Sequence, residues 1–133
     1  MNYALDACAM LAYLRGEPGG DVVASILTDP SATCFAHRVN QIEVYYDILR
    51  REDESSASKA LSALHEDGII ERRDMSKPFA LYVGQLKARG RISIADCFCI
   101  ALAHKMGAVI VTSDHLEFDP IICLDIVPIR FIR

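Results

Sequence analysis

Four acidic residues occupy positions from which their carboxylates could meet in space. Asp6 and Asp114 each follow a short apolar run that is typical of a buried strand. In an open parallel sheet, ligands bind in the crevice outside the carboxyl ends of the strands, so both side chains would enter the same crevice. Asp96 falls in the first turn of one expected helix and Glu43 in the first half of another. We therefore expect the four carboxylates to converge.

Clustered carboxylates are suited to binding a hard divalent cation. Mg²⁺ prefers oxygen ligands, and it usually takes one or two carboxylates together with waters and substrate phosphates. Without a cation, the acids would repel one another and raise one another's pKa values. A bound metal activates water and polarises phosphate oxygens. The four acids therefore predict a Mg²⁺ site capable of phosphodiester hydrolysis.

Simpler interpretations of the same acids stay open at this point. The sequence from Ser93 to Asp96 fits a capping box, in which the acid only satisfies a free amide at a helix start. Asp114 could form a turn, and Glu43 could be an ordinary solvated helix residue. Asp6 is harder to explain in this way, because burying an unpaired carboxylate costs several kcal/mol unless the group holds a partner or a metal.

Strand-like and helical segments alternate along the chain. Periodicity and break signals predict strands over 2–5, 33–36, 69–70, 108–111 and 126–129, and helices over about 8–15, 21–27, 39–51, 57–64, 78–88 and 93–106. Strands separated by helices indicate an α/β layered fold with a mainly parallel sheet. Pro128 places the last strand at an edge, because proline cannot donate to a central ladder.

Length and composition limit the class of protein. A chain of 133 residues with 52% hydrophobic residues is expected to form a single domain, 1–133. Its apolar runs fall short of the roughly 18 residues of a membrane-spanning helix, and no secretory signal is visible, so no membrane partner and a cytoplasmic location are expected. The net charge of −4 argues against nucleic-acid binding by bulk charge, so any such role must come from a site.

The five cysteines do not predict a disulfide framework. Their number is odd, and the cytosol keeps thiols reduced. The close pair Cys97 and Cys99 lacks the two-residue spacer of zinc knuckles and redox motifs. All five cysteines are therefore expected to be small core residues.

Blocks around the four acids resemble a known family. These blocks cover residues 6–11, 15–19, 41–46, 92–97 and 112–114, together with Phe118. In this order they are similar to the PIN domain, especially to the VapC-type toxins of prokaryotic toxin–antitoxin pairs. The resemblance extends over nearly the whole chain. It implies a three-layer α/β/α sandwich with a mainly parallel central sheet, as in other PIN-like domains.

The resemblance also implies an activity and assigns residues to it. The chain would be a Mg²⁺- or Mn²⁺-dependent endoribonuclease, the toxin of a type II toxin–antitoxin system. Asp6, Glu43, Asp96 and Asp114 would be the catalytic metal ligands. The hydroxyl of Thr112 would support the end of its strand.

Further residues and partners follow from the same resemblance. Glu117 or Asp119 would add a supporting acid. Arg89 and Arg91 are candidate contacts to RNA phosphates, since they directly precede the helix of Asp96. The expected partners are an RNA substrate, a cognate antitoxin protein and a second copy of the chain in a homodimer.

Two other functions compete with this hypothesis. Cys8 and Asn40 stand where many relatives carry a hydroxyl or another polar residue, which allows a catalytically inactive PIN-like module that binds RNA or protein. A nucleotide-binding or receiver-type domain is disfavoured, because no glycine-rich loop follows the first strand and no lysine ends the 108–111 strand. A general-base role for His115 is unnecessary if a metal activates the water.

Overall fold

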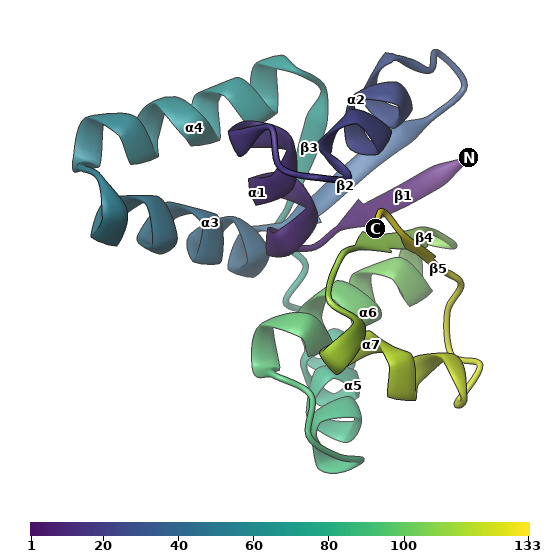
Figure 1. Cartoon of the computed structure of the whole chain (residues 1–133). Helices are drawn as coiled ribbons and strands as arrows, with labels where there is room; N and C mark the ends of the chain where they lie inside the picture. The colour runs from purple at the N-terminus through teal and green to yellow at the C-terminus, as the bar shows by residue number, and fades with distance from the viewer.

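A five-stranded parallel sheet forms the centre of the molecule (Figure 1), seen in a computed structural model that describes residues 1–133. Its strands are β1 (Asn2–Leu5), β2 (Thr33–His37), β3 (Ile69–Arg72), β4 (Val109–Thr112) and β5 (Ile129–Phe131). Their spatial order is β3-β2-β1-β4-β5, and every neighbouring pair is parallel. The predicted parallel sheet is confirmed.

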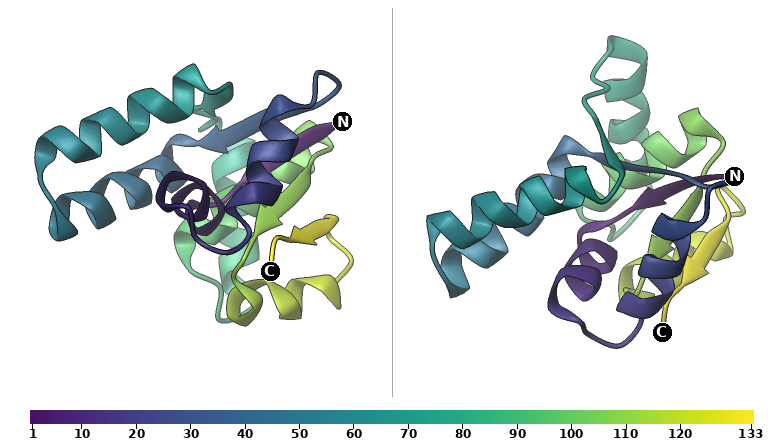
Figure 2. Two further views of the ribbon diagram at one scale, coloured as in Figure 1. Left: turned by 45° about the horizontal axis from the view of Figure 1, so that its top comes forward. Right: turned by 90° about the horizontal axis from the view of Figure 1, so that it is seen from above.

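Seven helices cover both faces of this sheet. They are α1 (Ala7–Arg15), α2 (Gly20–Thr28), α3 (Arg38–Arg51), α4 (Glu54–Glu66), α5 (Lys77–Ala88), α6 (Ile94–Met106) and α7 (His115–Ile122). Helices α5, α6 and α7 lie on one face; α1 and α2 lie on the other, and α3 and α4 extend beyond the sheet as a pair (Figures 1 and 2). None of the helices is both long enough and apolar enough to cross a membrane.

The side chains of alternate strand residues pack into two separate apolar cores, one on each face of the sheet. Ala4 and Ile110 belong to the core under α5, α6 and α7, whereas their neighbours Leu5 and Val111 belong to the core under α1 to α4. This alternation is the consequence of side chains pointing to opposite faces of a strand. The three-layer α/β/α fold expected from the sequence is therefore confirmed.

The order of the strands places two of the four acids side by side. The chain runs outward from β1 through β2 to β3, and then returns to the other side of β1 to form β4. Leu5 of β1 is paired in register with Val111 of β4. The residues after these two strands therefore share the crevice at the point where the strand order reverses, which is the usual ligand site of such sheets.

The C-terminal part of the chain departs from the sequence prediction in two places. Helix α7 was not expected, because Pro120 lies inside it and proline usually interrupts a helix. The sequence does contain a pattern typical of a helix start, because Asp114 precedes Glu117 by three residues. The last strand was predicted at 126–129 but β5 is Ile129–Phe131.

Substitution of alanine for two glycines, Gly20 and Gly84, is expected to change the stability of the protein in opposite directions. A β-carbon at Gly20 would lie 2.5 Å from the carbonyl oxygen of Ala12, whereas one at Gly84 would meet no atom within 4 Å. Gly20→Ala is therefore expected to destabilise the protein by about 1–3 kcal/mol. Gly84→Ala is expected to stabilise it by about 0.5–1 kcal/mol, because alanine is the better residue inside a helix. Urea unfolding of both variants checks this pair, and an equal effect of the two changes would contradict it.

Candidate metal-dependent active site

Asp6 is the most deeply buried of the four acids, with 1% of its surface exposed. Its Oδ1 accepts a hydrogen bond of 2.8 Å from the backbone of Ala9, which caps α1. Its Oδ2 accepts a bond of 2.5 Å from the hydroxyl of Thr112. Burial raises the pKa of Asp6 to about 7 although both hydrogen bonds act in the opposite direction, and the charges of Asp114 and Glu43 add to the rise.

Thr112 connects the ends of β1 and β4. Its buried hydroxyl donates to Asp6 and accepts a 2.9 Å hydrogen bond from the backbone N–H of Asp114. The Oδ1 atom of Asp114 accepts from the backbone of Glu117 at 3.1 Å and caps α7. Asp114 is thus the N-cap of α7, a role that the sequence analysis did not assign to it, and its other carboxylate oxygen makes no protein hydrogen bond.

Asp96 lies in the first turn of α6, and its carboxylate does not complete the capping box. The Ser93 hydroxyl accepts a 3.2 Å hydrogen bond from the backbone of Asp96. In a capping box the acid would return to the Ser93 N–H, but that amide donates instead to Glu117 Oε2 at 3.1 Å. Asp96 is 8% exposed. Burial and the charge of Asp6 raise its pKa to about 7.

Glu43 reaches the same region from α3. Its side chain is half-buried and takes part in no ion pair. Its pKa is raised by burial and by the charges of Glu117 and Asp114. Glu43 is therefore not an ordinary solvated helix residue. The charge of Glu117 also raises the pKa of Asp96, so Glu117 is a fifth acid in the region.

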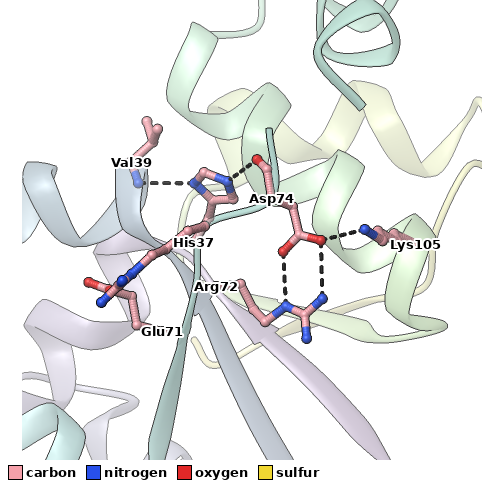
Figure 3. A network of polar contacts seen from close by, with 7 residues as sticks. His37, Val39, Glu71, Arg72, Asp74 and Lys105 are labelled. Carbon is pink, nitrogen blue, oxygen red and sulfur yellow. Dashed lines mark hydrogen bonds and ion pairs between the residues drawn. The ribbon is translucent and has the colours of Figure 1, made fainter. Parts of the chain in front are cut away.

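A polar network fixes the start of α3 (Figure 3). His37 Nδ1 accepts from the backbone of Val39 at 3.1 Å, so Nε2 carries the proton and donates to the carbonyl of Asp74 at 2.9 Å. The Asp74 carboxylate pairs with both Arg72 and Lys105 (Figure 3), and these cations hold its pKa well below the usual range. Its contacts from Asp74 to His37 and to Lys105 join residues 37 and 31 positions apart, so no local sequence pattern indicates them.

Asn40 joins the helix of Glu43 to that of Asp96. It is fully buried, and its Nδ2 donates to the carbonyl of Ala95 at 3.0 Å. Its Oδ1 is the one buried side-chain polar atom without a hydrogen-bond partner. In this chain, the residue type that departs from the expected pattern therefore forms a direct contact between α3 and α6.

Comparison with known protein families identifies the family of this fold. A model of the PIN domain matches residues 3–119, a span that contains all four acids. The chain belongs to the PIN domain family. No curated protein matches it in sequence.

Solved structures of toxin–antitoxin proteins share the fold of this PIN domain. A VapBC complex from Rickettsia felis bound to a promoter DNA fragment aligns with a TM-score of 0.75 at 16% identity, covering 98% of each chain. VapBC-1 from nontypeable Haemophilus influenzae aligns with 0.72 at 18% identity, covering 99% of this chain and 98% of that one. A sarcin-ricin loop cleaving VapC toxin of Mycobacterium tuberculosis aligns with 0.70 at 13% identity, covering 89% and 94%.

Three other sequence-predicted residues of the PIN domain lie outside the acidic cluster, which comprises Asp6, Glu43, Asp96, Asp114 and Glu117. Arg89 and Arg91 are exposed in the loop before α6 and line a cavity together with Glu117. Asp119 is exposed and lies 3.1 Å from His115 Nδ1. The charge of Asp119 is not among those that raise the pKa values of Asp6, Asp96 and Glu43, so the structure does not join it to the cluster.

His115 contacts residues near the C-terminus of the chain. Its Nε2 lies 2.8 Å from the carbonyl oxygen of Arg133, and its ring stacks on Phe131 at 3.8 Å between centroids. These contacts raise the pKa of His115, the Arg133 carbonyl first and Asp119 next. His115 therefore secures the C-terminal residues to the start of α7.

The donor set of this PIN domain suits a divalent cation. The protein forms eight ion pairs, and none of them includes Asp6, Glu43, Asp96, Asp114 or Glu117. No three His, Cys, Asp or Glu side chains are grouped so as to hold an ion by themselves. Mg²⁺ does not need such a cage, because it retains several waters and takes one or two carboxylates. The residues therefore fit a hydrated hard cation that offsets the repulsion between them.

Two cysteines differ from the predicted core positions and can be told apart by reactivity. Cys123 is exposed, which contradicts the sequence prediction, while Cys8 is half-buried beside the acids. Burial and the surrounding carboxylates, Asp6 first among them, raise the pKa of Cys8 to about 12. Since only the thiolate reacts, a thiol reagent at pH 8 should modify Cys123 rapidly and Cys8 only after unfolding.

Cys123→Ser is the matched variant for this experiment, and it should remove the rapid phase of labelling followed by mass spectrometry. Rapid modification of Cys8 in the folded protein would contradict the placement of its thiol among the acids.

Proposed function

We propose that this PIN domain is a divalent-metal-dependent endoribonuclease and the toxin of a type II toxin–antitoxin pair. The observation that carries the proposal is a pair of buried carboxylates, Asp6 at the carboxyl end of β1 and Asp96 in the first turn of α6, whose charges interact and which pair with no cation of the protein. The fold shared with a VapC toxin that cleaves the sarcin-ricin loop supports RNA as the substrate.

The proposed roles follow from the positions of the side chains. Asp6, Asp96, Asp114 and Glu43 would hold Mg²⁺ or Mn²⁺, which, when bound, supplies an activated water and polarises the scissile phosphate. Thr112 orients the carboxylate of Asp6 through its hydroxyl. Ionised carboxylates at the site would repel the phosphates of RNA unless the cation offsets their charge, so substrate affinity should require the cation.

Glu117 and the loop arginines complete the proposed site. Glu117 holds the N-terminus of α6 through the amide of Ser93 and so positions Asp96. Arg89 and Arg91 would contact phosphates of the RNA beyond the scissile bond, because neither takes part in an ion pair within the protein.

The proposal includes two protein partners in the cytoplasm. A cognate antitoxin is supported by the VapBC complexes among the similar structures. A homodimer is supported by an apolar stripe on α3, where Ile42, Tyr46 and Leu49 are 53%, 44% and 39% exposed and share one helix face. Light scattering should give twice the chain mass for the wild type, and Tyr46→Glu should shift the mass toward the monomer.

Metal titration together with an RNA cleavage assay tests the enzymatic part. Calorimetry should detect binding of Mg²⁺ or Mn²⁺ to the purified protein, and cleavage of RNA should appear with either ion and stop with EDTA. Expression of the chain alone should arrest bacterial growth. No binding and no cleavage of any RNA would contradict the nuclease and favour an inactive PIN-like binding module.

A further inference from the structure

A cavity of about 370 Å³ lies between the loop that precedes α6 and helix α7. Apolar side chains of Leu116, Ile121 and Leu124 form part of its lining. Arg89 and Arg91 line it as well. Its volume lies within the range of small-molecule sites in proteins.

One residue, Glu117, links this cavity to the acidic site. Glu117 lines the cavity, and its Oε2 accepts from the Ser93 N–H at the start of the Asp96 helix. The charge of Glu117 acts on both Asp96 and Glu43. A group that occupies the cavity would therefore lie beside a residue that also holds the start of the Asp96 helix.

The lining of the cavity contains highly exposed apolar side chains and two arginines that form no ion pair. Leu116 is 90% exposed and Leu124 is 50% exposed. Neither Arg89 nor Arg91 forms an ion pair with any carboxylate of the protein. An apolar peptide side chain could cover the leucines but would leave both guanidinium groups without an anion.

A nucleotide can contact both the apolar side chains and the two arginines that line the cavity. Its base has apolar faces that can lie against leucine or stack on a guanidinium plane, and its phosphates pair with arginine. We propose that the cavity is a base-binding subsite, which takes one unstacked base of the RNA next to the scissile phosphate. This inference rests on the proposed nuclease function and narrows its substrate to RNA with an unpaired base at that position.

Removing either the cavity wall or the base tests the subsite. Leu116→Ser reduces the apolar wall without adding charge, and its high exposure makes a folding defect unexpected. Leu81→Ser is the matched control, because Leu81 is 56% exposed on α5 and does not line the cavity. The substrates are a single-stranded RNA of about 12 nucleotides, within the range of single-strand site sizes, and a series with one abasic residue at each position in turn.

The expected result is a non-additive loss of substrate affinity. At one position near the cleaved bond, the abasic RNA should raise the KM of the wild type about tenfold, and Leu116→Ser should raise KM for the intact RNA similarly, with kcat little changed. The variant and the abasic substrate together should lose no more than either alone, because both remove the same contact. Leu81→Ser should behave as the wild type.

The outcomes separate the subsite from the nuclease. Cleavage by the wild type with no sensitive position, or with additive effects at every position, would overturn the subsite and leave the nuclease intact. An unchanged KM in Leu116→Ser combined with weakened binding of the cognate antitoxin would overturn it in favour of a protein partner. Absence of metal-dependent cleavage by the wild type would overturn the proposed function itself.

The two arginines provide an independent measurement. Arg91→Gln should lower the slope of log affinity against log salt by about 1, as expected for one lost phosphate contact. The affinity is taken from the KM of the wild type and of Arg91→Gln for the intact RNA, measured with Mg²⁺ at several salt concentrations. A slope equal to that of the wild type would contradict a phosphate contact by Arg91.

Discussion

Asp6→Asn should lower the rate of metal-dependent RNA cleavage on the order of 10³-fold, the upper range for removing one electrostatic group from an active site. The carboxylate lies at the carboxyl end of β1 between the Thr112 hydroxyl and the Ala9 amide. The asparagine can still accept from the Ala9 amide, and its NH₂ can donate to Thr112. The fold should therefore persist while the negative charge that holds the cation is lost.

Asp119→Asn is the matched control for this prediction. It makes the same chemical change at an exposed carboxylate of α7 that lies beside His115 and outside the acidic cluster. Its cleavage rate should stay within about twofold of the wild type, as expected for a surface change away from the site. Steady-state cleavage and calorimetric metal titration of both variants give the comparison. Wild-type cleavage by Asp6→Asn would refute the assignment of Asp6.

The second large effect concerns stability in the absence of metal. The pKa of Asp6 is about 7 in the folded protein against 3.8 for an ordinary aspartate. Between these values the folded state keeps a proton that the unfolded state has released. Unfolding therefore becomes easier as pH rises through this window, and the penalty is complete above pH 7. Asp6→Asn removes it, so at pH 8 without metal the variant should be more stable than the wild type by about 2–4 kcal/mol.

Comparison of the wild type with Asp6→Asn removes the contribution of His37 and leaves that of Asp6 together with its effect on Asp96, whose pKa the charge of Asp6 raises. Burial lowers the pKa of His37, which adds a loss of stability below its ordinary pKa, opposite in direction to the Asp6 effect. The difference in unfolding free energy between the wild type and Asp6→Asn cancels that contribution. It should grow from pH 5 to pH 8 in EDTA and shrink when Mg²⁺ or Mn²⁺ is added. A difference that is constant with pH would contradict the raised pKa of Asp6.

The elements of the fold were predictable where a local pattern was strong. The β-branched run before Thr112 identified β4, and Gly68 and Gly107 identified the ends of two helices. These two glycines adopt positive φ angles of 102° and 59°, which explains why the signal is local. Helix α7 was not predicted, although the spacing of Asp114 and Glu117 is that of a helix start; the helix also contains Pro120, which is unusual inside a helix.

The acids of the site were recognisable one by one, but their environment was not. Ser93 and Asp96 have the spacing of a capping box, and only the structure shows that Glu117 takes the second half of that motif. The contact from Asn40 to Ala95 joins residues 55 positions apart, and no local pattern indicates it. The same is true of the pairing of His37 with Asp74.

The sequence by itself determined the alternation of strands and helices and the four candidate acids, because both depend on residue type and local spacing. The tertiary structure decided that β1 lies beside β4, so that Asp6 and Asp114 share one crevice. It also decided that Glu117 faces this crevice while Asp119, two residues later, faces solvent. Those outcomes depend on contacts between distant segments and on their burial, which shift pKa values and are not encoded in any short stretch of the chain.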